Sequence, residues 1–262
     1  MQPHVTLPGL LEAYRKGEIS REEAVSRIEG LRIEQLGDFA RLDLGRAARC
    51  GVPEAVLAEG KDPGQLTEIV ARNVAAQGRC IVTRVTPEQA ERILRRCAEE
   101  GYQTDHREIA RVLVAFRSPP PEKNGGVVAI LTAGTADVPA AEEARVIAEE
   151  MGCAVLTAYD VGAAGIHRLF PALKAVLGAH VFVVAAGREG TLPAVVAGLV
   201  DRPVIGLPVS TGYGYMGEGR AALASMLQSC SVLAVVNIDA GFTAGALAAR
   251  IATMAAGGGV MG

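Results

Sequence analysis

Residues 127–256 alternate short apolar runs with longer amphipathic segments. The apolar runs predict strands at Val127–Leu131, Ala154–Thr157, Val181–Ala185, Val204–Leu207 and Leu233–Val236. Apolar residues at helical spacing predict helices at about Pro139–Met151, Gly165–Leu177, Leu192–Val200, Gly219–Gln228 and Gly241–Ala256. Unbroken apolar strands are typical of parallel sheets with both faces covered by helices. The pattern therefore predicts an α/β fold with a doubly wound parallel sheet.

The first 118 residues predict a smaller α/β domain preceded by a helical hairpin, whose second helix begins at Ser20. Strands are expected at Cys80–Val85 and Val112–Phe116, separated by a helix from about Pro87 to Glu100. Three prolines and two glycines within residues 117–126 indicate a linker. We therefore expect an N-terminal domain over residues 1–118, a linker over 119–125, a second domain over 126–256 and a disordered tail over 257–262.

The amino-acid composition indicates which kinds of binding partner are not expected. Half of the 262 residues are hydrophobic, which supplies a sizeable core and excludes global disorder. A net charge of -3 leaves no basic surplus for a phosphate backbone, and 4% aromatic residues offer few stacking surfaces, so nucleic-acid binding is not expected. The first residues lack the pattern of a signal peptide, and no apolar run approaches the roughly 20 residues that cross a bilayer. We expect a cytoplasmic protein without a membrane partner.

The five cysteines are isolated, which argues against a disulfide scaffold and a zinc knuckle. Four are interpreted as small buried hydrophobic residues, namely Cys50, Cys80, Cys97 and Cys153. Cys230 lies between Ser229 and Ser231 and has the most polar neighbourhood, so it is the candidate thiolate nucleophile. The alternative is a buried cysteine at an ordinary helix end.

Ligands of doubly wound sheets bind outside the carboxyl ends of the strands, and unusual residues follow four of the predicted strands. The loop after the strand Val127–Leu131 is short and leads into the N-terminus of a helix. Its free backbone amides and the positive end of the helix dipole could bind a phosphate. There, Gly134 allows close approach and Thr135 offers a hydroxyl, while Asp137 either caps the helix or joins the phosphate site. Neither standard glycine-rich nucleotide fingerprint is present.

The next two loops carry carboxylates. Asp160 follows the second strand, where an acidic side chain commonly accepts hydrogen bonds from ribose hydroxyls. His167 lies in the first turn of the next helix and either contacts the ligand or has a structural role. Glu189 follows the third strand between Gly187 and Gly190. A carboxylate in an enclosed site, where burial raises its pKa, suits proton transfer. Alternatively, Glu189 binds loop amides near the following helix.

The fourth loop, Pro208–Gly217, is rich in glycine and hydroxyl groups. These groups predict contacts to phosphate or ribose, with an aromatic ring available for stacking. The candidate residues are Ser210, Thr211, Gly212, Tyr213 and Gly214.

Several of these segments together resemble the carboxylase/hydrolase family of nickel-pincer cofactor biosynthesis. The matching runs are TAGTADVPAAEEA, YDVGAAGIHRL, AAGREGTLPAVVAGLVDRPVIGLPVSTGYG, MLQSC and VVNIDAGF, with FARLD, VPEAVLAEGK and IVTRVTPEQAE in the N-terminal region. The second domain is also similar to the purine-pathway aminoimidazole-ribotide carboxylase/mutase, through AGTAD, LPAVVAGL and RPVIGLPV. The resemblance implies a flavodoxin-like sheet in three layers.

The resemblance also implies a substrate, nicotinic acid adenine dinucleotide, and two reactions. The pyridinium ring is carboxylated at C5 by carbon dioxide or bicarbonate, and the phosphoanhydride is hydrolysed to release AMP. Cys230 matches the family's nucleophile, which adds to the ring and makes it electron-rich, and Glu189 matches its proton-handling acid. Mg²⁺ is implied through the substrate phosphates, no metal ligands are identified, and a homo-oligomer, an octamer by analogy, is expected.

The chain departs from the family pattern at three positions: Gln228 replaces Asn, Arg188 replaces Met, and Thr243 replaces a frequent Gly. Two other functions stay open. One is the aminoimidazole-ribotide carboxylase/mutase, whose chemistry needs no cysteine. The other is a non-catalytic nucleotide-binding module built on the same sheet.

Overall fold

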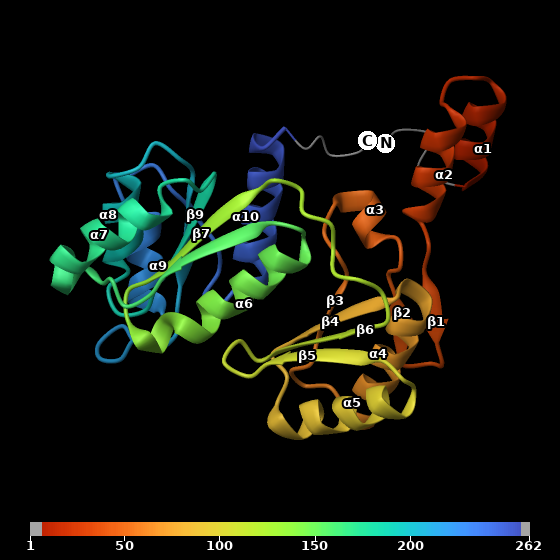
Figure 1. Cartoon of the computed structure of the whole chain (residues 1–262), viewed down its shortest axis with the longest axis horizontal. Coiled ribbons are helices and arrows are strands. Elements are labelled where there is room, and N and C mark those ends of the chain that lie inside the picture. The colour runs from red at the N-terminus through yellow and green to blue at the C-terminus, as the bar shows by residue number, and fades with distance from the viewer. Residues whose placement is uncertain (1–6, 258–262) are drawn as a thin grey trace. The chain divides into compact units, whose positions relative to one another are not determined.

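Residues 7–257 are described by the structure, a computed structural model; the predicted tail beyond residue 257 lies outside the described residues. The chain divides into two compact units (Figure 1). Among the described residues, the first comprises 7–106 and 113–119, and the second comprises 107–112 and 120–257. None of the helices within residues 7–257 is both long enough and apolar enough to cross a membrane.

The second unit is built on a five-stranded sheet. Its strands lie in the order β8-β7-β9-β10-β11, and all the neighbouring pairs are parallel. Their bounds are β7 (Val127–Thr132), β8 (Ala154–Ala158), β9 (Val181–Ala186), β10 (Val204–Pro208) and β11 (Ala234–Val235). Counted from the first strand, this is the order 2-1-3-4-5 of flavodoxin-like folds. The predicted doubly wound parallel sheet is confirmed.

Five helices cover the two faces of this sheet (Figure 1). Strand residues alternate between the faces: Val128 and Ile130 pack toward α6 and α10, whereas Ala129 and Leu131 pack toward α7, α8 and α9. The helices extend over α6 (Val138–Glu150), α7 (Ile166–Val176), α8 (Thr191–Ala197), α9 (Arg220–Leu227) and α10 (Gly241–Ala255). Each predicted helix of this region is present, with ends shifted by a few residues.

One strand departs from the expected burial. The apolar runs predict that helices cover every strand on both faces, but Ala154 and Thr157 of β8 are exposed. The reason is position: among residues 7–257, β8 pairs with β7 alone and is therefore an edge strand. Helices at the margin of an open sheet cover an edge strand only in part, and composition does not reveal which strand will be at the edge.

The two helices on one face approach closely because α10 presents glycines to α6. A Cβ atom on Gly241 would lie 2.5 Å from the Ala140 carbonyl oxygen, and one on Gly245 would lie 2.3 Å from the Ala144 carbonyl oxygen. Both distances are shorter than any real contact, so only glycine permits this crossing. The alanines of both helices fill the remaining space.

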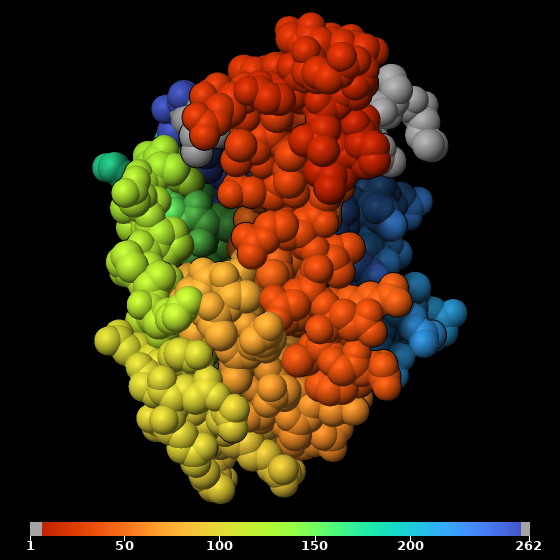
Figure 2. All heavy atoms as spheres, turned by 90° about the vertical axis from the view of Figure 1, so that its right-hand side faces the viewer, coloured from red at the N-terminus to blue at the C-terminus, as the bar shows by residue number. Residues whose placement is uncertain are grey.

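The first unit begins with the predicted helical hairpin, α1 (Leu7–Arg15) and α2 (Arg21–Glu29). In Figure 2 the surface of this unit faces the viewer, with the hairpin in red at one end and α5 at the other. An antiparallel pair follows, β1 (Glu34–Leu36) and β2 (Ala40–Leu42), and then the short helix α3 (Arg46–Cys50).

A four-stranded sheet completes the first unit, in the order β3-β4-β6-β5. The predicted strands and helix are present as β4, β6 and α5, but the sequence patterns missed β3, β5 and α4. The reasons are physical: β3 has three residues, and β5 reads QTDHR, which has no apolar run. The bounds are β3 (Ala55–Leu57), α4 (Pro63–Gln77), β4 (Arg79–Thr83), α5 (Pro87–Glu99), β5 (Gln103–Arg107) and β6 (Val112–Phe116).

The helix crossing gives a test of stability. Gly245→Ala should lower the free energy of unfolding by about 1–3 kcal/mol, although alanine favours helix, because the new methyl group overlaps a backbone oxygen of α6. Chemical denaturation measures the difference. Gly178→Ala is the matched control, since a Cβ there meets nothing within 4 Å and should change stability by less than about 0.5 kcal/mol. Equal stability of both variants would show that the helices do not need this contact.

Candidate functional site

The order of the strands identifies the edge of the sheet where a ligand should bind. The chain moves from β7 to its neighbour β8 and then continues on the other side of β7 with β9. Ligands of such sheets bind outside the carboxyl ends of the strands at this reversal. The loops after β7 and β9 lie there, and the loop after β10 is next to them.

Asp137 connects these loops. It ends a short 3-10 helix, η1 (Thr135–Asp137), and its side chain is 4% exposed. One carboxyl oxygen accepts a hydrogen bond from the backbone amide of Gly134 at 2.8 Å, and the other accepts from the hydroxyl of Thr211 at 3.1 Å. The side chain makes no capping bond to α6. Asp137 therefore joins the loop after β7 to the loop after β10.

The loop after β9 passes between these two groups. A Cβ atom on Gly187 would lie 2.5 Å from the Thr211 hydroxyl oxygen and 2.9 Å from a carboxyl oxygen of Asp137. Any larger residue would push the loops apart. The predicted residues Gly134, Gly187 and Thr211 are thus brought together around one carboxyl group, with Gly134 donating its amide to that group.

Burial raises the pKa of Asp137 above its ordinary value. Hydrogen bonds from the Gly134 amide, the Thr211 hydroxyl and the Gly187 amide oppose this shift, and the negative charge of Glu189 adds to it. Two carboxyl groups therefore lie within electrostatic reach of each other at this edge. A pair of acids whose surroundings differ can divide the roles of proton donor and acceptor.

Glu189 does not occupy the enclosed setting that the sequence predicts, because its side chain is exposed. The buried carboxyl of this site is that of Asp137 instead. Gly190 ends the loop with φ of 67°, and a Cβ there would lie 2.6 Å from the Ala222 carbonyl oxygen of α9. Glu189 is therefore held on a loop whose end packs against α9.

The loop after β10 lies beside Gly187. Ser210 donates its backbone amide to a carboxyl oxygen of Asp239 at 2.9 Å, and a Cβ on Gly212 would lie 3.3 Å from the Gly187 carbonyl oxygen. Gly214 has φ of 96° with no neighbour within 4 Å of its Cβ position. Sequence reasoning did not single out Asp239, although it follows the last strand just as the four predicted loops follow theirs.

The loop after β8 packs against the loop after β7, where a Cβ atom on Gly162 would lie 2.6 Å from the Ala133 carbonyl oxygen. Asp160, with φ of 56°, forms an ion pair with Arg168 at 2.6 Å and donates its amide to the hydroxyl of Thr132 at 3.0 Å. His167 lies in the first turn of α7 and is exposed. The carboxylate predicted to accept ribose hydroxyls is therefore engaged by an arginine.

Cys230 lies apart from the other predicted catalytic residue. It follows the C-terminal end of α9, whereas the Glu189 loop ends at Gly190 against Ala222 in the N-terminal half of that helix. A helix of eight residues is about 12 Å long. The neighbouring Ser231 donates its hydroxyl to the Ala194 carbonyl in the last turn of α8 at 3.0 Å. Within residues 7–257, no hydrogen bond joins the Cys230 thiol to the carboxyl group of Glu189 or of Asp137.

The thiols differ in exposure. Cys230 is exposed, which differs from the alternative of a buried cysteine at a helix end, whereas Cys80, Cys97 and Cys153 are buried. Burial raises the pKa of Cys97 to about 11, so its thiol stays protonated at neutral pH. The prediction that the other four cysteines are buried is wrong for Cys50, which is exposed at the end of the short helix α3.

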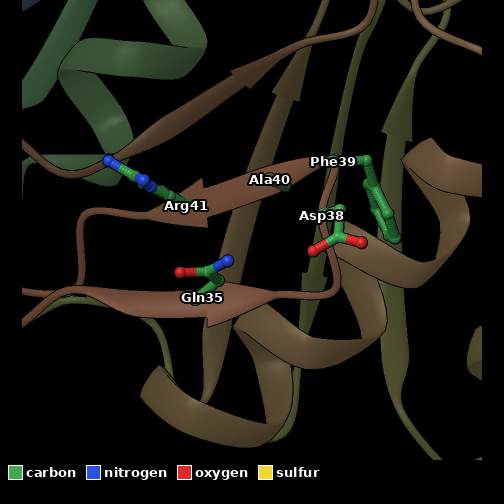
Figure 3. Close-up of a pocket in the computed structure, with 5 residues that line it drawn as sticks. All are labelled: Gln35, Asp38, Phe39, Ala40 and Arg41. Atoms are coloured by element: carbon green, nitrogen blue, oxygen red, sulfur yellow. The ribbon is translucent and has the colours of Figure 1, made fainter.

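No cluster of three or more histidine, cysteine, aspartate or glutamate residues that could hold a metal ion is found within residues 7–257. A shallow pocket of about 250 Å³ lies on the β1–β2 hairpin in the first unit (Figure 3). Gln35, Asp38, Phe39, Ala40 and Arg41 line it, and none is a predicted site residue. Its volume is below the roughly 300 Å³ at which ligand pockets begin.

The raised pKa of Asp137 predicts a pH dependence of stability. A raised folded-state pKa means that the folded protein binds more protons than the unfolded one, so stability falls as pH rises above the ordinary pKa of aspartate. Asp137→Asn removes this titration. Denaturation at a series of pH values should show the wild type losing stability relative to this variant as pH rises. A relative gain would mean that the folded-state pKa is lowered.

Family models match both units of the chain. A LarB/PurE-like N-terminal domain matches residues 33–117, and an AIR carboxylase domain matches residues 127–257. The second match contains every predicted site residue, including the loops around Asp137 and the Cys230 thiol.

Two relatives agree with these matches. A protein of Methanocaldococcus jannaschii with no assigned activity is 42% identical over 252 residues, which are 94% of this chain and 96% of that protein. A probable N5-carboxyaminoimidazole ribonucleotide mutase of Methanothermobacter thermautotrophicus is 33% identical over 130 residues, 47% of this chain and 37% of that protein. The two family matches indicate an enzyme of the carboxylase/mutase kind. The chain belongs to the LarB family, in which a LarB/PurE-like N-terminal domain precedes a PurE-like AIR carboxylase domain.

Proposed function

We propose that the chain carboxylates the pyridinium ring of nicotinic acid adenine dinucleotide at C5 and hydrolyses its phosphoanhydride. The products are pyridinium-3,5-biscarboxylic acid mononucleotide and AMP, and carbon dioxide or bicarbonate is the co-substrate. The observation that carries the proposal is the meeting of Asp137, Gly187, Thr211 and the Glu189 loop at the ligand edge of an AIR carboxylase sheet.

The ring carbon must first become nucleophilic. A cationic pyridinium is electron-poor and does not attack carbon dioxide. When the thiolate of Cys230 adds to the ring, one C–S bond forms, the positive charge is lost and an enamine with a nucleophilic C5 results. The exposure of Cys230 lets a substrate reach the sulfur. After C5 bonds to carbon dioxide, loss of the C5 proton and departure of the thiolate restore the aromatic ring.

Glu189 accepts the C5 proton in this proposal. Its exposed side chain projects from a loop fixed by Gly187 and Gly190. Asp137 lies within electrostatic reach of Glu189, and its hydrogen bonds to the Gly134 amide and the Thr211 hydroxyl hold the neighbouring loops in place.

The remaining loop residues are proposed to hold the nucleotide. Thr135 is exposed, and the glycine-rich loop after β10 offers hydroxyl and backbone groups for ribose and phosphate. Asp160 could accept a ribose hydroxyl with the carboxyl oxygen that Arg168 leaves unused. Mg²⁺, held mainly by the substrate phosphates, would offset their negative charge.

The position of Cys230 supports a homo-oligomer. Cys230 follows the C-terminal end of α9, whereas the Glu189 loop ends against Ala222 in the N-terminal half of that helix. We propose that the ring held by the loops of one copy meets Cys230 of another. Symmetric association would complete every site in this way. An octamer is the expected state by analogy with the carboxylase domain.

The proposed reaction is tested with purified protein, nicotinic acid adenine dinucleotide, bicarbonate and Mg²⁺. Mass spectrometry should detect AMP and the biscarboxylated mononucleotide. Cys230→Ser should lower the carboxylation rate more than about a hundredfold, because an alcohol is a far weaker nucleophile than a thiolate. Cys50→Ser, at the other exposed cysteine, is the matched control and should keep the wild-type rate. Carboxylation by Cys230→Ser at the wild-type rate would refute the mechanism.

The shared site is tested by complementation. Cys230→Ser and Glu189→Gln should each be inactive alone. When the two variants are co-expressed with different tags and purified as mixed oligomers, about a quarter of the sites should receive both intact groups, which gives about a quarter of the wild-type rate. Mixed oligomers that stay inactive would show that both groups act within one chain.

A second candidate is the aminoimidazole-ribotide mutase reaction, which the Methanothermobacter relative's name favours. It needs neither Cys230 nor a pyridinium ring. Turnover of N5-carboxyaminoimidazole ribonucleotide by the Cys230→Ser variant at the wild-type rate would favour this candidate.

A further inference from the structure

Arg188 and Tyr213 form a stacked pair at the ligand edge of the sheet. The guanidinium carbon of Arg188 lies 4.4 Å from the centre of the Tyr213 ring. The same guanidinium donates a hydrogen bond from Nη1 to the Tyr213 hydroxyl at 2.6 Å. Arg188 belongs to the loop after β9 and Tyr213 to the loop after β10. The pair therefore spans the two loops that hold Glu189 and Thr211.

The backbone beneath this pair is tightly packed. A Cβ atom on Gly212 would lie 3.4 Å from the Arg188 Cα atom and 3.3 Å from the Gly187 carbonyl oxygen. The backbone of Arg188 is therefore held in place next to Gly187, and the Tyr213 ring restricts the conformations of the Arg188 side chain. Restriction before binding lowers the entropy that a ligand contact must overcome.

Arg188 also differs from the other arginines at this edge. Arg168 is paired with Asp160 at 2.6 Å, and Arg220 is paired with Glu218 at 3.1 Å. Arg188 has no carboxylate partner among residues 7–257, and its interaction with tyrosine leaves its positive charge in place. A guanidinium group without a carboxylate partner can bind the paired oxygens of a phosphate.

Several backbone amides of these loops are not available to a phosphate. Gly134 donates to Asp137, Ser210 donates to Asp239, and Asp160 donates to the Thr132 hydroxyl. The carboxyl groups of Asp137 and Glu189 add negative charge near the same place. A dinucleotide phosphate approaching this edge needs a cation, and Arg188 supplies one.

We propose that Arg188, positioned by Tyr213, binds a phosphate group of the nucleotide substrate. The inference rests on the proposed function in that it concerns the same site. It adds a specificity residue to the loops around Asp137. When the phosphate binds, the guanidinium keeps its stack on Tyr213 and directs its other N–H groups to the phosphate oxygens.

Calorimetric titration of the full-length protein with AMP and with adenosine tests this role. Arg188→Met should weaken AMP binding about tenfold, the loss expected for one charged hydrogen-bonded contact, and leave adenosine binding unchanged. Arg188→Lys should recover part of the affinity for AMP, and the salt dependence of AMP binding should be weaker in Arg188→Met than in the wild type. Arg220→Met is the matched control and should bind AMP as the wild type does.

Tyr213→Leu tests the positioning role. It should weaken AMP binding less than Arg188→Met does, and the double variant should bind AMP no more weakly than Arg188→Met alone, because the two residues act as one unit. Equal AMP affinity of Arg188→Met and wild type, equal losses for AMP and adenosine, or a wild type that does not bind AMP would overturn the inference. Arg188-dependent AMP binding without any carboxylation would overturn the proposed function alone.

Discussion

The hydrogen bonds of one buried carboxyl group, that of Asp137, hold the ligand edge of the sheet together. They join the Gly134 amide after β7 to the Thr211 hydroxyl after β10, with Gly187 of the intervening loop packed against both. Because the three strands are neighbours, fixing these contacts fixes the loops that carry Glu189 and Arg188. A buried carboxyl group that lost these partners would carry an uncompensated desolvation cost, so the arrangement is strongly preferred.

The groups that we propose to act on the substrate lie near opposite ends of α9. Carboxyl groups and the Arg188 cation gather where β7, β9 and β10 end, whereas the exposed thiol of Cys230 follows the far end of α9. This division follows from topology, since helices that return across a parallel sheet end at the opposite edge from the loops. This is why the proposed reaction, which brings both groups to one ring, includes a second copy of the chain.

The sequence predicted the second unit well because its strands are continuous apolar runs and its helices have clear apolar spacing. It also located Gly134, Gly187 and Thr211, since strand ends and glycine-rich loops are visible in sequence. Burial was not predictable in the same way. Glu189 is exposed and Asp137 is buried, because that difference depends on how three loops pack. The contact between Arg188 and Tyr213, 25 residues apart, likewise has no local signal.

The position of the bound substrate tests the account most directly. A crystal structure of the full-length protein with nicotinic acid adenine dinucleotide should place the pyridinium ring within contact distance of a Glu189 carboxyl group and of a Cys230 sulfur from a neighbouring copy. A dinucleotide bound elsewhere, with its ring remote from the loops around Asp137, would contradict the account.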